Sequence, residues 1–222
     1  MFDKPLISLA FDDGWRNAHT RAAPIMEACG LRGTFYVITR MPSYMLSEGE
    51  GRMTVEDWVD LRGRGHEIGA HSRTHAELPK CSETDLESEV GGSRADLATA
   101  GIEATTFAYP FGQKNASVAA AVARAGFRAG RLYNEKLNRA GSERWSLGSF
   151  AATGGLSIAD AETLLQRAVR SKSWLILTFH QIEHDPPPCG MTEDQFRRVC
   201  ELVAQQPADV VTVEEGARRL NG

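Results

Sequence analysis

Short apolar segments alternate with helix-forming segments along the whole chain, and this alternation constrains the fold more than any other feature. The segment 174–179 shows almost no apolar/polar alternation, and 6–11 is a similar short apolar run. Such runs are typical of strands buried on both faces of a parallel sheet. Ser or Thr followed three residues later by Asp or Gln, a helix-start pattern, occurs between predicted strands at Thr54, Ser82, Ser157 and Thr192. Repeated strand–helix units of this kind predict an α/β fold with a parallel sheet.

The number of predicted strands and the length of 222 residues favour one barrel of seven or eight strands over two small sheets. The predicted strands are 6–11, 34–38, 66–70, 105–108, 127–132, 146–150, 174–179 and 209–213. Residues 40–53 contain Pro and Gly and are predicted to form a long loop. No repeat, low-complexity segment or linker divides the chain, so we expect a single domain over residues 1–222.

Composition excludes several classes of protein. The formal net charge is −4 and no basic run is present, so nucleic acid is not an expected partner. No apolar stretch approaches the roughly 20 residues that span a bilayer. The first residues lack a basic segment followed by a long apolar one, which predicts a cytoplasmic protein; an exported protein with its signal removed is the alternative. The four cysteines form no C-x-x-C pair, so neither a thiolate zinc site nor a disulfide framework is expected. The oligomeric state stays open.

Polar residues directly follow several predicted strands, and the carboxyl ends of parallel strands meet at one rim of the sheet. Asp12 and Asp13 follow the first strand, His71 and His75 follow the third, and His180 follows the most apolar one. We therefore expect these side chains to form one constellation at that rim.

This constellation suits metal chemistry. His71 and His75 are four residues apart, which on a helical turn places both imidazoles on one side. Two histidines with one carboxylate leave open coordination positions, as a catalytic Zn²⁺ requires, with Co²⁺, Ni²⁺ or Fe²⁺ as alternatives. Each residue also has an ordinary structural interpretation, because Asp-Asp-Gly is turn material and histidines often cap or pack. A histidine beside a metal is a natural proton donor, and His180 is the candidate for that role.

The order of these motifs resembles the polysaccharide deacetylases, the NodB homology domain of carbohydrate esterase family 4. Residues 10–14 resemble the first motif, usually T-F-D-D-G, and 65–75 resemble the second, which is the most specific. Residues 107–112 resemble the third motif and 177–180 the last. The resemblance extends from Leu6 to the last strand. It implies a distorted (β/α)₇ barrel and metal-dependent removal of N- or O-acetyl groups from an amino-sugar-containing glycan or glycan precursor.

The resemblance also implies a role for each residue. Asp13, His71 and His75 would hold one divalent metal, Zn²⁺ in the first place. Asp12 would be the general base and His180 the general acid. The third motif would bind substrate and the oxyanion, with the amide of Phe111 as donor. The residues concerned are Tyr109, Pro110 and Phe111.

Two positions depart from the family pattern. The Arg that usually opens the third motif is Ala108 here, so another cation or a hydrogen bond must hold Asp12. The family also places an acidic group and a Trp near the acid histidine. Trp145 has no Asp beside it, and Glu143 is the candidate acidic partner.

Two alternative functions stay open at this point. One is an amidase or deformylase that acts on a smaller substrate, and the other is a catalytically silent, carbohydrate-binding barrel. The presence of Asp12 and His180 argues against the silent barrel. A groove with aromatic walls would favour a polymer, and a pocket closed by the 40–53 loop would favour a small sugar. The candidate wall residues are Tyr36, Tyr109, Phe111, Tyr133 and Trp145.

Overall fold

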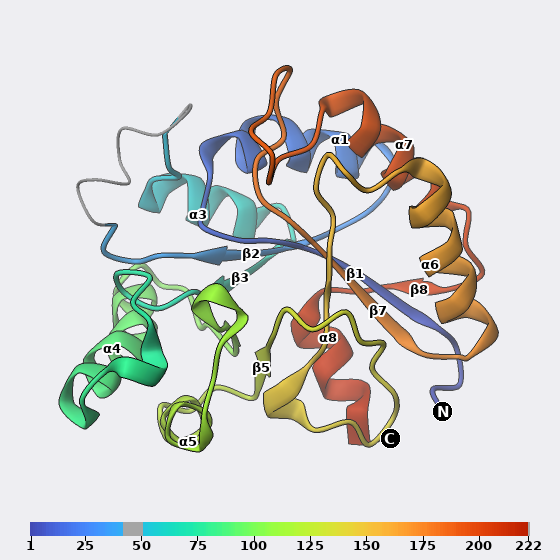
Figure 1. The fold of residues 1–222 in the computed structure, drawn as a ribbon. Coiled ribbons are helices and arrows are strands. Elements are labelled where there is room, and N and C mark those ends of the chain that lie inside the picture. The colour runs from blue at the N-terminus through green and yellow to red at the C-terminus, as the bar shows by residue number, and fades with distance from the viewer. Residues whose placement is uncertain (42–50, 222) are drawn as a thin grey trace.

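The computed structural model describes residues 1–41 and 51–221, which form one curled parallel sheet with helices around it (Figure 1). Seven strands follow one another in the order β5-β4-β3-β2-β1-β7-β6, and β8 pairs with the start of β1. The strands are β1 (Leu6–Phe11), β2 (Thr34–Val37), β3 (Glu67–Ala70), β4 (Thr106–Ala108), β5 (Ala129–Arg131), β6 (Phe150–Ala151), β7 (Trp174–Phe179) and β8 (Asp209–Val210). This is a distorted (β/α)₇ barrel, so the predicted fold class is confirmed.

The central strand β1 determines where the functional rim lies. It pairs with β7 along its whole length, up to Phe11 opposite Phe179. All six residues of each strand are buried, as the lack of polar alternation predicts. Because the two strands end in register, Asp12 and His180 leave the sheet at the same level.

The two outer strands of the sheet approach each other through the segment that leads into β6. Arg131 in β5 forms a parallel bridge with Leu147. The Leu147 amide donates to the Gly130 carbonyl at 3.0 Å, and the Leu132 amide donates to the Leu147 carbonyl at 2.8 Å. These bonds curl the sheet toward closure and bring the end of β5 to the rim formed by β1 and β7.

Helices connect the strands and cover the outside of the sheet (Figure 1). Their bounds are α1 (Ala23–Ala28), α3 (Val55–Gly63), α4 (Glu83–Thr99), α5 (Ala116–Arg124), α6 (Ile158–Arg170), α7 (Glu193–Ala204) and α8 (Val213–Arg218), with a π-helical turn at Ala18–Ala22 before α1. The four predicted helix starts are confirmed: each Ser or Thr side chain accepts a hydrogen bond from the amide three residues later. Among the described residues, no helix is both long and apolar enough to cross a bilayer.

Helix α8 was not predicted, and it replaces the end of the expected strand at 209–213. Thr212 caps it and exchanges hydrogen bonds with Glu215. The Val213 amide donates to Thr34 Oγ1 and the Glu214 amide to Glu67 Oε2, at 2.9 and 2.8 Å. Since Thr34 and Glu67 begin β2 and β3, α8 lies at the barrel end opposite the rim.

Two other predictions need correction or fall outside the described residues. The predicted strand 146–150 starts later, because Arg144–Ser146 forms a 3₁₀ turn and pairing with β7 begins at Phe150. The predicted loop at 40–53 is described only at its ends, since 42–50 lie outside the described residues. The cysteines form no disulfide, as expected.

The two ends of the chain lie close together. Met1 and Leu6 line a cavity of about 430 Å³ together with Arg219, which follows α8. Leu6 is the first residue of β1. Both ends are therefore at the barrel end away from the rim that carries Asp12 and His180.

Candidate functional site

The structure brings Asp13, His71 and His75 together at the rim. One potential ligand atom from each lies within 4.8 Å of the other two. The Nε2 atoms of His71 and His75 are 3.4 and 3.5 Å from Asp13 Oδ1. Asp13 follows β1 and His71 follows β3, so the sheet itself brings the first two ligands together.

The hydrogen bond of His71 to the backbone prepares it for a metal. Its Nδ1 is 2.8 Å from the Ala108 carbonyl oxygen. A carbonyl oxygen only accepts, so Nδ1 carries a proton, and Nε2, which faces Asp13, is the nitrogen that a cation would bind. Metal-bound histidines usually donate their second ring N–H in this way. The three side chains therefore fit a divalent cation, Zn²⁺ or a metal of similar preference.

The charges in this group support the same interpretation. Burial raises the pKa of Asp13, but the hydrogen bond to His71 and the nearby histidines lower it further, and the net result lies well below the usual range. Burial and then the charge of His71 lower the pKa of His75 to about 4. Burial lowers the pKa of His71, but Asp12 and Asp13 outweigh it and the net shift is upward. The Asp13 carboxylate is therefore ionised, the form in which it can bind a cation.

Several residues of the site have left-handed backbone geometry. The φ angles of Asp13, Ser72, His75 and Phe111 are +69°, +62°, +60° and +57°. Non-glycine residues rarely adopt this region, and they remain there only where surrounding contacts hold them. The rim is thus a strained region held by its neighbours.

Arg131 is the cation that holds Asp12. Its Nη2 atom lies 2.5 Å from both carboxylate oxygens of Asp12, and both side chains are almost fully buried. Nη1 donates to Ser149 Oγ at 3.3 Å. Arg131 is the register partner of Ala108 in the neighbouring strand. The arginine that the third motif lacks is therefore supplied one strand further along the sheet.

We expect Arg131→Met to lower the free energy of unfolding by about 3–5 kcal/mol, because it leaves the Asp12 carboxylate buried without its partner. Urea denaturation of the metal-free protein measures this change. The double variant Asp12→Asn/Arg131→Met should recover much of the loss, since its amide carries no charge. Arg139→Met, at an exposed arginine, is the matched control. Equal stability of Arg131→Met and the control would contradict the assigned pairing.

His180 faces the candidate metal ligand Asp13, and its Nε2 is 4.0 Å from Asp13 Oδ2. Its Nδ1 is buried and has no hydrogen-bond partner within the described part of the chain. Glu143 instead accepts from Ser146 Oγ at 2.7 Å and lies 3.6 Å from Lys114 Nζ. The prediction that Glu143 is the partner of His180 is therefore wrong.

Of the three third-motif residues predicted to bind substrate, Phe111 is the one that is exposed at the rim. Its side chain is 56% exposed, and its ring centroid lies 4.5 Å from that of His75. Tyr109 and Pro110 are buried, so their side chains do not form part of the exposed surface. Tyr36 is also a core residue, which corrects its assignment and that of Tyr109 as groove walls.

The remaining wall candidates differ in position. Tyr133 lies beside His180 at the rim, with the two ring centroids 6.1 Å apart. Trp145 packs against the hydrophobic core. A cavity of about 270 Å³ opens beside Asp13, between the end of β2 and the start of α3. Whether the 40–53 loop closes over this cavity depends on residues outside the described ranges.

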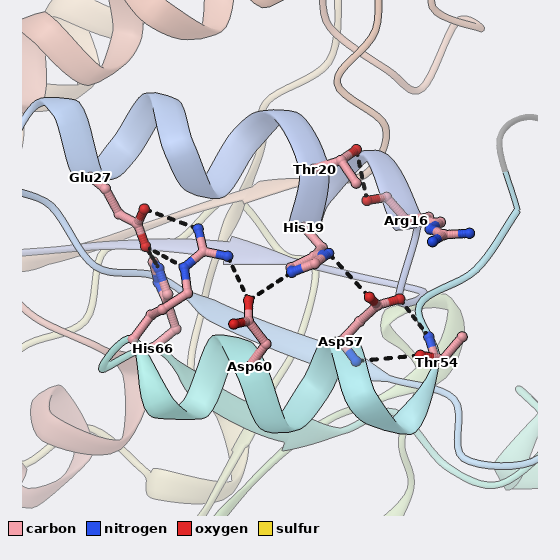
Figure 2. A network of polar contacts seen from close by, with 9 residues as sticks. Arg16, His19, Thr20, Glu27, Thr54, Asp57, Asp60 and His66 are labelled. Atoms are coloured by element: carbon pink, nitrogen blue, oxygen red, sulfur yellow. Dashed lines mark hydrogen bonds and ion pairs between the residues drawn. The ribbon is translucent and has the colours of Figure 1, made fainter.

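His66 belongs to the second motif but to a different network (Figure 2). Its Nδ1 accepts from the Gly33 amide at 3.0 Å, so its Nε2 carries the proton and donates to Glu27 at 3.0 Å. Burial lowers the pKa of His66 more than Glu27 raises it. Arg64 joins the same carboxylate through two hydrogen bonds. His66 is thus a neutral structural residue that connects α1 to the start of β3.

Comparison with known proteins identifies one family whose profile covers more than half of the chain. The profile of the family described as polysaccharide deacetylase matches residues 2–130. A gellan lyase from Bacillus sp. is 35% identical over 120 residues, which are 51% of this chain and 4% of that protein. The chain spans 4% and 43% of the lengths of the two curated relatives that it matches.

Solved structures resemble this chain beyond the residues that the family profile matches. The chitin deacetylase of the fungus Colletotrichum lindemuthianum superposes with a TM-score of 0.68 at 17% identity, over 100% of this chain and 89% of that one. The Streptococcus pyogenes deacetylase PplD, solved with acetate, gives 0.63 at 21% identity, over 73% and 69% of the two chains. At these identities the likeness concerns the fold.

Proposed function

Since this chain belongs to the polysaccharide deacetylase family, we propose that it is a metal-dependent hydrolase that removes acetyl groups from an amino-sugar-containing glycan or glycan precursor. The observation that carries the proposal is the convergence of Asp13, His71 and His75, with Asp12 and His180 at the ends of two paired strands. Metal-assisted hydrolysis of an amide requires a set of metal ligands, a fixed carboxylate that can act as a base and a histidine that can act as an acid.

Asp13, His71 and His75 would hold the cation, which we propose is Zn²⁺. A divalent ion bound there would supply Lewis acidity toward the acetyl carbonyl and activate a water molecule. Asp12 would accept the proton of the attacking water. Arg131 contacts both oxygens of Asp12, so the orientation of this base is fixed before substrate binds.

His180 would donate a proton to the departing amine, because an amine anion leaves poorly. Its Nε2 points toward Asp13 and is the nitrogen that would carry this proton. The Phe111 amide would donate to the oxygen that becomes negatively charged as the acetyl carbon is attacked. The left-handed conformation of Phe111 gives this turn its unusual backbone direction.

Acetate release from a panel of N-acetylated sugars tests the proposal. The panel should include monomeric N-acetyl sugars and oligomers of increasing length, with the protein reconstituted in Zn²⁺ and metal content measured in parallel. We expect acetate release that depends on added metal and disappears with a chelator. Amide hydrolysis confined to small non-sugar amides or formamides would support an amidase or deformylase instead. Sugar binding without any acetate release would indicate a silent barrel.

The role of His180 predicts a dependence on the leaving group. His180→Ala should lower the turnover of an N-acetyl sugar by about 10²-fold or more, because its amine needs a proton in order to leave. The same variant should hydrolyse an activated aryl acetate nearly as well as the wild type, since a phenolate leaves unaided. Equal losses on the two substrates would mean that His180 shapes the pocket and does not donate the proton.

A further inference from the structure

The loop that carries His75 is held by a carboxylate outside the metal group. Between His71 and His75 the chain turns through Ser72, Arg73 and Thr74. The His71 amide donates to the Val37 carbonyl at 2.9 Å, and the His75 amide donates to Ser72 Oγ at 3.0 Å. The amides of Arg73 and Thr74 also need an acceptor.

Glu89, on α4, is that acceptor. Its Oε2 atom accepts from the Arg73 amide at 3.1 Å and from the Thr74 amide at 2.9 Å. Its Oε1 atom accepts from Thr74 Oγ1 at 2.7 Å. One carboxylate therefore holds two consecutive backbone N–H groups and one hydroxyl, all within the turn that separates the two histidine ligands.

A second anchor on the same helix holds the side chain of Arg73. Asp96 accepts from Arg73 Nε at 2.9 Å and from Arg73 Nη2 at 3.0 Å. Gly92 lies between the two anchors, and a Cβ atom there would come within 2.3 Å of Arg73 Cζ. The guanidinium of Arg73 therefore lies directly against α4 at Gly92, where a larger residue would have to displace that side chain. Both anchors stand on the same 17-residue helix.

This support matters because the loop is strained. Ser72 and His75 both have left-handed φ angles, which non-glycine residues leave unless contacts hold them. Relaxation of either residue would turn the imidazole of His75 away from Asp13. We propose that Glu89 is a positioning residue that holds this turn in its ligand-bearing conformation, and so sets the affinity of the site for its metal without touching the metal. This inference rests on the metal site proposed above.

Zinc affinity of the folded protein tests the inference, measured by competition with a chromogenic chelator. We expect Glu89→Ala to raise the Kd for Zn²⁺ by about 10–100-fold, the usual effect of losing a group that orients a ligand. Glu89→Gln should lie between Glu89→Ala and the wild type, because its amide oxygen can still accept the two backbone N–H groups. Glu87→Ala, an exposed position on the same helix, is the matched control and should leave the Kd unchanged.

The absorption spectrum of the Co²⁺-loaded protein provides an independent readout. We expect Glu89→Ala to change the visible bands of bound Co²⁺, since His75 would no longer be held, and Glu87→Ala to leave them unchanged. Unaltered Zn²⁺ affinity and an unaltered spectrum in Glu89→Ala would overturn the inference. If Glu89→Ala does not fold, Glu89→Gln and Glu89→Asp replace it; the shorter side chain of Asp cannot reach the turn. Wild-type Zn²⁺ affinity in both of these variants would overturn the inference. Failure of the wild type itself to bind Zn²⁺ or Co²⁺ would instead refute the proposed metal site.

Discussion

Replacing His71 with alanine should remove bound metal and acetate release together. His71 is almost fully buried, its Nδ1 is fixed by the Ala108 carbonyl, and its Nε2 points at Asp13. A zinc site binds with roughly 10–16 kcal/mol shared among its ligands, so losing one of three protein ligands should cost about 3 kcal/mol or more. This corresponds to a loss of affinity of about a hundredfold or more. Elemental analysis after dialysis against metal-free buffer measures the effect.

His19→Ala is the matched control for this experiment. His19 also lies beside two carboxylates, with Nε2 2.9 Å from Asp60 and Nδ1 3.3 Å from Asp57 (Figure 2). Its two ring nitrogens face separate carboxylates, so this histidine does not form a converging ligand set. We expect His19→Ala to retain its metal. Full metal content in His71→Ala would show that the ligands are assigned incorrectly.

Replacing each of the two adjacent aspartates with asparagine should have different effects on metal binding and on turnover. Asp12→Asn should keep the metal but lower turnover by about 10²–10⁴-fold, because an amide cannot accept the proton of the attacking water. Asp13→Asn should weaken metal binding as well, since Asp13 Oδ1 faces both histidine ligands. The two variants are isosteric with the wild-type residues, so they change charge and leave the volume almost unaltered.

Metal content and acetate release measured on the same preparations decide between these roles. A protein with Asn at position 12 should bind Zn²⁺ with wild-type stoichiometry and release acetate slowly. Excess Zn²⁺ should not rescue it, whereas it should partly rescue Asp13→Asn. The reverse pattern would mean that base and ligand are exchanged between the two positions.

Much of the site was predictable because strand ends are visible in the sequence. Unalternating apolar runs identify β1 and β7, and the first polar residues after them must lie at the carboxyl rim of a parallel sheet. This is how Asp12, Asp13 and His180 could be expected to come together. The helix starts were equally readable, because a capping side chain and its target amide are only three residues apart.

The residues that hold the site residues in place, Arg131 and Glu89, could not be predicted. Their contacts depend on strand register and on packing between segments that are distant in the sequence. Arg131 stands in a predicted strand, but only the pairing of β5 with β4 places it opposite Ala108 and near Asp12. Glu89 looks like an ordinary helix surface residue until the loop carrying His75 packs against it. The buried position of Tyr109 likewise depends on which face of β4 turns inward.

The position of the two chain ends has a consequence for how such a domain can be attached to other proteins. Met1 and Arg219 lie near each other at the barrel end closed by α8, away from the rim with Asp12 and Asp13. A linker joined at either end would leave the rim unobstructed. Both connections would then lie on one side of the barrel, with Asp12 and Asp13 on the other.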